Sequence, residues 1–229
     1  MANKKILLGL TTTPDSDWRG KVKEIDRLGI KEIALFPTFL KTAERNELYG
    51  LLEKTRLESI PHVHIRGEDM PLAEMDYFVK KYHTEVFNTH SPREFPINYD
   101  YSKYKQLIYL ENSNFIPDEN EINLLGNGLC VDFSHWDSGL KAKWPGYESF
   151  EKLVTKFPVG CAHISAMTNA ITYWVNGWPA YESHTFKKLK QFDYIKKYLQ
   201  YLPNIISMEL ENSFEEQLKV QAYLEKIIN

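Results

Sequence analysis

Short apolar runs alternate with amphipathic stretches along the whole chain, which is the pattern of strands and helices that follow each other in turn. Strands are predicted for residues 5–11, 31–36, 59–65, 84–88, 107–110, 128–133, 159–164 and 205–210. Most of these runs are nearly continuously apolar, which is typical of strands in a parallel sheet that is covered on both faces.

Apolar side chains at helical spacing follow most of these runs. In the first such segment, Trp18, Val22, Ile25 and Leu28 recur along one face, and Gly29 ends the pattern. Further helices are predicted for about residues 42–55, 72–82, 117–125, 147–157 and 185–202. A last helix opens at residue 213, where a glutamate three positions later completes a capping box. Residues 93–102 and 166–183 show no clear period and are predicted to be loops.

Eight strands, each followed by a helix or a helical turn, predict an α/β protein with a parallel sheet. This number of units in this length favours a closed (β/α)8 TIM barrel that uses residues 1–229 as a single domain. The alternative is an open, doubly wound sheet. The sequence contains no glycine-rich phosphate loop or dinucleotide fingerprint, which weakens that alternative.

Polar side chains lie at or beyond the carboxyl ends of the predicted strands, where a barrel carries its chemistry. In chain order they are His62 and His64, His90, Glu111, Asp132 and His135, His163, and Glu209 with Glu211. Because side chains alternate along a strand, Glu209 shares its face with Ser207 and not with the apolar Met208. A carboxylate pointing into a barrel without a partner is unfavourable, whereas a group of carboxylates and imidazoles can bind a divalent cation.

Each of these residues also has an ordinary structural explanation. A single histidine at a strand end is more often a hydrogen-bonded structural group than a metal ligand, and the aromatic stretch at residues 173–179 could simply pack a long loop. The coincidence decides between the two interpretations. Six of the chain's seven histidines lie at or beyond predicted strand ends, together with Glu111, Asp132 and Glu209, which indicates a metal site.

Composition narrows the class of protein further. The chain of 229 residues is 43% hydrophobic with a formal net charge of −3, which argues against a nucleic-acid partner held by bulk charge. The only cysteines, Cys130 and Cys161, lie inside predicted strands, which favours a reducing compartment and no disulfide. We find no signal peptide and no apolar run of about 20 residues, so no membrane span is expected and a cytoplasmic protein is the default.

The strand-end residues resemble the pattern of the xylose-isomerase-like TIM barrel superfamily. That superfamily includes sugar isomerases and epimerases, and also the endonuclease IV type of DNA-repair phosphodiesterase. The resemblance implies a divalent metal, such as Mn, Zn or Co, bound by Glu111, Asp132, His163 and Glu209. The run Asp132-Phe133-Ser134-His135 also matches the family's Asp-x-x-His signature.

The endonuclease branch of the family uses additional ligands for further metal ions. It has one histidine after the third strand, one after the fourth, and an Asp-x-His motif in the seventh loop. The candidates here are His62 or His64, then His90, then Glu182 and His184, with Glu182 in place of the family's aspartate. His135 is a further-metal ligand in this branch and a substrate contact in the isomerase branch.

Two enzymatic functions and one binding function follow from the resemblance. The first is a metal-dependent isomerase or epimerase of a sugar or a similar hydroxy-carbonyl compound. In it Glu111 and Glu209 exchange a proton with the substrate through an enediolate, and Trp174 or Trp178 covers an apolar ring face. The second is a multi-metal phosphodiesterase or hydrolase, and the third is a catalytically silent barrel that binds a small molecule. The sequence leaves a homo-oligomer open.

Overall fold

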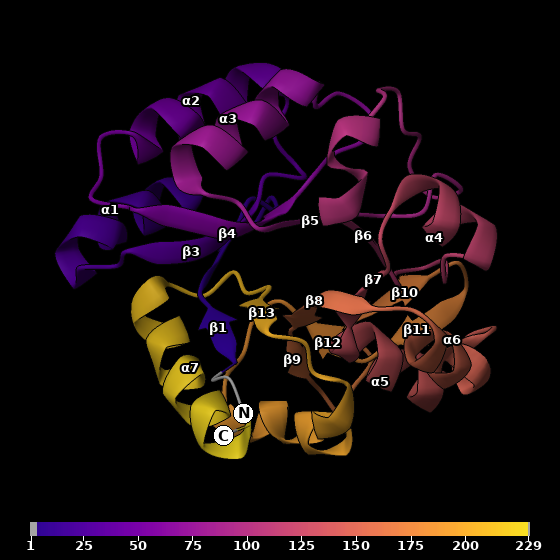
Figure 1. The fold of residues 1–229 in the computed structure, drawn as a ribbon. Helices are drawn as coiled ribbons and strands as arrows, with labels where there is room; N and C mark the ends of the chain where they lie inside the picture. The colour runs from indigo at the N-terminus through magenta and orange to yellow at the C-terminus, as the bar shows by residue number, and fades with distance from the viewer. Residues whose placement is uncertain (1–3, 229) are drawn as a thin grey trace.

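The parallel strands of the chain close into a barrel (Figure 1). In the computed structural model, which describes residues 4–228, the sheet has the order β1-β13-β8-β7-β6-β5-β4-β3-β2. β1 (Lys5–Leu7) pairs with β13 (Ile205–Met208), and β2 (Gly9–Thr11) pairs with β3 (Glu32–Phe36). Only Leu8 separates β1 from β2, so the two act as one strand that joins both edges of the sheet. The prediction of an α/β protein with a (β/α)8 barrel is confirmed.

The other elements alternate with the barrel strands in the predicted order. The remaining barrel strands are β4 (Ser59–His64), β5 (Val86–Thr89), β6 (Ile108–Glu111), β7 (Leu129–Asp132) and β8 (Val159–Ile164). The α-helices are α1 (Trp18–Leu28), α2 (Thr42–Leu52), α3 (Leu72–Tyr82), α4 (Glu119–Leu125), α5 (Phe133–Ala142), α6 (Phe150–Lys156) and α7 (Phe214–Ile228). The 3-10 helices are η1 (Ser102–Leu107), η2 (Tyr147–Ser149), η3 (Leu189–Lys197) and η4 (Leu199–Tyr201).

The helices pack around the outside of the barrel, and Figure 1 shows α1, α2 and α3 over one side of it and α7 beside β1. Outward-facing strand residues such as Ile33 and Leu35 join the large core cluster between strands and helices. Their neighbours Ala34 and Phe36 face the barrel interior, where they form a smaller apolar cluster. Fully burying one such side chain stabilises the fold by about 1.5–3 kcal/mol, so this alternation fixes which residues point inward.

The segment after β7 differs from the prediction. We predicted one helix near residues 147–157, but α5 begins directly after Asp132, and the later segment is η2 followed by α6. Glycine, serine and aspartate side chains in α5 are poor helix formers, which hid the helix in the sequence. It forms because the Asp132 side chain caps its first turn and because Phe133 and Trp136 are buried against the core.

The predicted loop at residues 166–183 contains short strands. They are β9 (Ala166–Met167), β10 (Tyr173–Val175), β11 (Trp178–Ala180) and β12 (Glu182–Ser183). β10 and β11 form a hairpin whose turn residues, Asn176 and Gly177, have φ values of 49° and 84°. Asn-Gly is the pair that two-residue turns of this left-handed kind prefer. The next segment, predicted as one helix over residues 185–202, consists of η3 and η4.

Neither cysteine forms a disulfide, since Cys130 and Cys161 are both free and buried. Within the described residues, none of the helices combines the length and the apolar character needed to cross a lipid bilayer.

Candidate metal centre

Four strands bring an imidazole and three carboxylates to one point at the carboxyl end of the barrel. Glu111 ends β6, Asp132 ends β7, His163 lies in β8, and Glu209 follows β13. One ligand atom of each of the four lies within 4.8 Å of one from every other member. Nδ1 of His163 is 3.2 Å from Oε1 of Glu111, 3.4 Å from Oε2 of Glu209 and 4.0 Å from Oδ2 of Asp132. We call these four residues the central cluster.

The two carboxylate oxygens of Asp132 have different roles, one in capping helix α5 and one in the central cluster. Oδ1 accepts hydrogen bonds from the backbone N–H of His135 at 2.8 Å and from the Ser134 hydroxyl. The bond from the His135 N–H makes Asp132 the N-cap of helix α5. Oδ2 is buried in the central cluster and has no hydrogen-bond partner. The helix therefore fixes the direction of the carboxylate, and one oxygen remains available to a ligand.

The central cluster fits a divalent cation. Like Oδ2 of Asp132, Nδ1 of His163 is a buried polar atom without a hydrogen-bond partner. Buried polar atoms of this kind are unfavourable unless something binds them. A set of one imidazole and three carboxylates suits Mn, Zn or Co, so the donor atoms and their unpaired state agree with such an ion.

A second group of ligand atoms shares Glu111 with the first. His64 ends β4 and His90 follows β5, and Nε2 of these residues lies 3.0 Å and 3.7 Å from Oε2 of Glu111. The two Nε2 atoms are 3.4 Å apart, so both rings aim at the same place. We call His64, His90 and Glu111 the histidine pair cluster. Glu111 thus offers Oε1 to the central cluster and Oε2 to the histidine pair cluster.

The third-strand histidines have different surroundings, which resolves the choice between His62 and His64. Nδ1 of His62 is 2.7 Å from the Ser207 hydroxyl, and Nε2 is 2.9 Å from Oδ1 of Asn88. The amide of Asn88 in turn donates to Oε2 of Glu111 at 2.6 Å. Both nitrogens of His62 are occupied inside the barrel, so His64 is the third-strand residue that faces the cavity.

A third set of candidate ligands lies beside the central cluster without meeting at one point. Nδ1 of His135 is 3.2 Å from Oε1 of Glu182, and its Nε2 is 3.8 Å from Oδ2 of Asp132. Nε2 of His184 is 3.9 Å from Oε1 of Glu209. Among the described residues, His135, Glu182 and His184 do not form a group with all ligand atoms in mutual reach.

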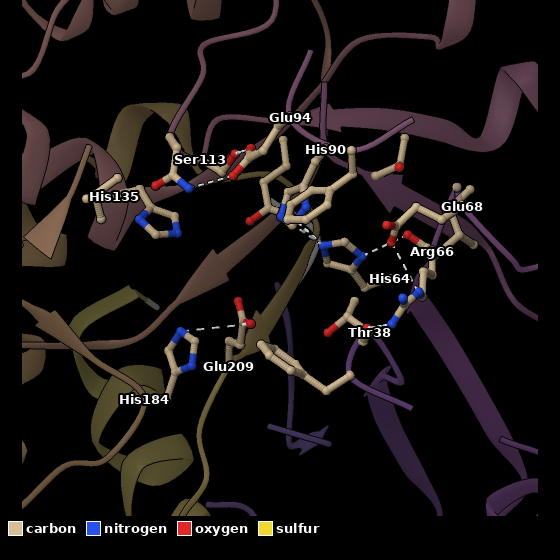
Figure 2. Close-up of a pocket in the computed structure, with 18 of the residues that line it drawn as sticks. Thr38, His64, Arg66, Glu68, His90, Glu94, Ser113, His135, His184 and Glu209 are labelled. Atoms are coloured by element: carbon tan, nitrogen blue, oxygen red, sulfur yellow. Dashed lines mark hydrogen bonds and ion pairs between the residues drawn. The ribbon is translucent and has the colours of Figure 1, made fainter. Parts of the chain in front are cut away.

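A cavity of about 370 Å³ is lined by the three residues of the histidine pair cluster and by Glu209 of the central cluster (Figure 2), whereas Asp132 and His163 lie outside this lining. The lining residues come from the carboxyl ends of the strands and from the segments that follow them, and they include Thr38, Phe39, His64, Arg66, Glu68, His90, Glu94, Phe95, Glu111, Ser113, His135, Tyr173, Val175, His184 and Glu209. Figure 2 shows His135 and His184 on the side opposite to His64.

The two tryptophans that we predicted to contact substrate are outside this lining. The β10–β11 hairpin presents Tyr173 and Val175 to the cavity. Trp174 lies between them and therefore points away, with 64% of its surface exposed. Trp178 pairs with Val175 but lies beyond the lining residues, with 40% of its surface exposed.

Excess negative charge governs the protonation of the histidines in the centre. Burial opposes the charged form of His163, but Glu111 and Glu209 outweigh it and raise its pKa well above the usual value. Burial likewise disfavours charged His135, but Asp132 and Glu182 raise its pKa to about 10. His90 differs, because burial dominates and lowers its pKa to about 4. Binding of a metal ion at His163 would therefore require the release of a proton.

Several residues of the site gave no signal in the sequence. Asn88 and Ser207 lie inside predicted strands, and neither is a usual metal ligand. Arg66 and Glu94 fall in loops without periodicity, and their place in the cavity wall depends on how these loops fold over the barrel. Side-chain alternation is the only signal that bears on the two strand residues, because it places Ser207 on the same face as Glu209.

Comparisons with known proteins find a similar fold among solved structures. No protein-family model matches the chain, and no curated protein matches it. Among solved structures, the chain is similar to a crystal structure described as "a Putative Xylose isomerase from Rhodospirillum rubrum ATCC 11170". The two chains are 11% identical, the match covers 98% of this chain and 97% of that chain, and the TM-score is 0.46. The barrel described above rests on the strand order and register of this chain itself.

Proposed function

We propose that the chain is a multi-metal hydrolase that cleaves small phosphodiesters. The observation that carries the proposal is the position of Glu111, which offers one oxygen to the central cluster and the other to the histidine pair cluster. A carboxylate placed in this way can bridge two cations. Paired cations are the usual arrangement in enzymes that displace an oxygen at phosphorus.

The chain's own residues have separate roles in this proposal. Asp132, His163 and Glu209 would hold one ion together with Glu111, while His64 and His90 would hold the other. Divalent cations in such positions supply charge neutralisation and Lewis-acid polarisation of the phosphate. Arg66 adds a guanidinium to the cavity wall, although Glu68 already pairs with it at 3.1 Å.

The size and charge of the cavity support a small substrate. A volume of about 370 Å³ is near the lower end of the range for small-molecule sites. Glu68, Glu94, Glu111 and Glu209 make the wall acidic, so an anionic ester depends on bound cations to enter. The overall charge of −3 does not favour a long nucleic acid.

A metal-dependent isomerase or epimerase of sugars is the second candidate. Glu209 favours it, because this carboxylate lines the cavity and belongs to a cluster that could hold a single ion. Glu111 is less suited to the required proton transfer. Its Oε2 accepts from Asn88 at 2.6 Å and lies 3.0 Å from Nε2 of His64, while Oε1 faces His163. A carboxylate surrounded by donors is a poor base toward a C–H bond.

Metal content and activity together test the proposal. We expect two or more divalent ions per chain by elemental analysis after metal loading and desalting. We also expect hydrolysis of bis(p-nitrophenyl) phosphate or of small alkyl phosphodiesters by the loaded protein. Glu111→Gln should lose ions from both clusters and lose activity. His83→Asn is the matched control, because His83 is exposed at the end of α3, outside the cavity lining, with a φ of 56° that asparagine tolerates.

The opposite pattern identifies the isomerase. One ion per chain, no ester hydrolysis, and incorporation of solvent deuterium at carbon in a panel of ketoses and aldoses would contradict the phosphodiesterase proposal. A Glu111→Gln variant that keeps both ions would contradict the bridging role of Glu111.

A further inference from the structure

Glu94 is a carboxylate of the cavity wall that belongs to neither metal cluster. It lies in the loop after β5, four residues beyond His90, and lines the same cavity as the histidine pair cluster (Figure 2). Among the described residues, no group of mutually close metal-ligand atoms includes it. It is thus an acidic side chain that faces the substrate space without a role in holding the ions.

Two neighbours hold both oxygens of Glu94 in place. The Ser113 hydroxyl donates to Oε2, and the amide of Asn114 donates to Oε1 at 2.6 Å. Ser113 is itself fixed, because it is 4% exposed and its carbonyl accepts from the Tyr147 hydroxyl at 2.6 Å. The carboxylate therefore has a defined direction in the cavity wall, which general acid–base catalysis requires.

Burial and the nearby charge of Glu111 allow Glu94 to carry a proton in spite of these two donors. A hydroxyl can donate or accept, so Ser113 can serve the carboxylate and, after rotation, the protonated acid. Burial raises the pKa of Glu94 above its usual value and the negative charge of Glu111 adds to this, whereas the hydrogen bonds from Ser113 and Asn114 and the charge of His135 act in the opposite direction. Arg93, its neighbour in sequence, does not neutralise it, since its guanidinium pairs with Glu121 at 2.8 Å.

We propose that Glu94 is a catalytic residue that protonates the leaving oxygen when the ester is cleaved, an inference that rests on the proposed function. In this step a water oxygen forms a new bond to phosphorus, and the bond between phosphorus and the leaving oxygen breaks. The carboxyl proton of Glu94 goes to the leaving oxygen, which departs as an alcohol. The proton released by the attacking water returns to Glu94 through solvent, so one water is consumed and no other reactant is needed.

Dependence on the leaving group tests this role with Glu94→Gln. An alkoxide leaving group needs the proton, whereas p-nitrophenolate departs without it. We therefore expect kcat for alkyl esters to fall about 10²–10⁴-fold, the usual contribution of a general acid. The rate for bis(p-nitrophenyl) phosphate should change by less than about fivefold, and the fall of the wild-type rate at high pH should vanish. Metal content should stay at the wild-type value.

Glu68→Gln is the matched control, because Glu68 lines the same cavity but pairs with Arg66. It should change the rates of alkyl and nitrophenyl esters by a common factor. Equal losses for both ester types in Glu94→Gln, or loss of bound metal, would overturn the assignment of Glu94 and leave the hydrolase intact. A metal-loaded wild-type protein that cleaves neither ester type would overturn the hydrolase itself, and the assignment of Glu94 with it.

Discussion

His62 holds the amide of Asn88 in one orientation. Oδ1 of Asn88 can only accept a hydrogen bond, so the proton in the 2.9 Å contact belongs to Nε2 of His62. Nδ1 of His62 lies 2.7 Å from the Ser207 hydroxyl, and the amide N–H of Asn88 is left to face Glu111. A chain of three hydrogen bonds inside the barrel therefore positions the carboxylate that both clusters share.

Asn88→Leu should lower the free energy of unfolding of the metal-free protein and remove a hydrogen bond that positions Glu111. The substitution keeps the number and branching of the side-chain heavy atoms but leaves Nε2 of His62 without its acceptor and Oε2 of Glu111 without its closest donor. Buried groups left unpaired cost about 1–3 kcal/mol each. Urea unfolding of metal-free protein measures the loss. Asn120→Leu on exposed α4 is the control and should change stability by less than about 0.5 kcal/mol; equal effects of the two substitutions would refute the role of the hydrogen-bond chain.

Asp132→Asn and Asp132→Ala should separate the two roles of this side chain. Asparagine keeps an oxygen to cap α5 but removes the charge from the central cluster, whereas alanine removes both. Both variants should lose the ion of the central cluster. Without metal, the alanine variant should be less stable than the asparagine variant by about 1 kcal/mol, the usual value of a cap. Chemical denaturation measures the difference, and identical stabilities would show that the cap contributes nothing.

Lys21 should make the free energy of unfolding depend on pH. Its side chain is 2% exposed, and Nζ donates to the Thr11 hydroxyl at 3.0 Å and to the Leu210 carbonyl at 2.5 Å. Burial lowers its pKa from 10.5 to about 7. Between these values the unfolded chain binds more protons, so this residue makes the free energy of unfolding rise with pH, by at most about 1.4 kcal/mol per pH unit.

Lys21→Met removes this contribution while keeping the aliphatic stem. His135, whose pKa is raised to about 10, contributes a trend of the opposite sign in both proteins. The difference between wild type and variant therefore isolates Lys21. We expect the wild type to gain stability relative to the variant as pH rises above about 7 and to approach a constant difference near pH 10. Parallel pH curves in urea unfolding would contradict the lowered pKa.

Substitutions in the β10–β11 hairpin should change KM only where the side chain faces the cavity. Val175 and Tyr173 line the cavity, whereas Trp174 points away from it. Val175→Ala should raise KM several-fold, because it removes apolar contact with the substrate. Trp174→Ala should leave KM and kcat within about twofold. Steady-state kinetics on the same ester would decide, and a larger effect of Trp174→Ala would show that the tryptophan contacts substrate.

The sequence predicts the barrel well because its signals are local and repeated. Each apolar run needs only to be buried on both faces, and the inward positions then follow from alternation, as Ser207 and Glu209 show. Capping at Asp132 was not recognised, because an aspartate at a strand end has the same appearance whether it caps a helix or binds a metal. The helix after β7 was therefore missed.

Neighbours that come together only in the folded chain could not be predicted. Alternation places His62 and His64 on one face, but only the positions of Asn88 and Ser207 show that His62 is fully engaged inside the barrel. The same holds for Glu94, whose loop lacks any period and whose partners Ser113 and Asn114 follow a different strand. The sequence thus predicts the positions of the candidate ligands, whereas only the structure shows which side chains hydrogen-bond to them.

Closure of the barrel through β1 and β13 also sets the time at which the centre can form. The ribosome delivers Glu111, Asp132 and His163 well before Glu209, which directly follows β13. A nascent chain therefore presents an incomplete set of candidate ligands until β13 has been made and can pair with β1. The centre is thus completed only by the last strand of the barrel to leave the ribosome.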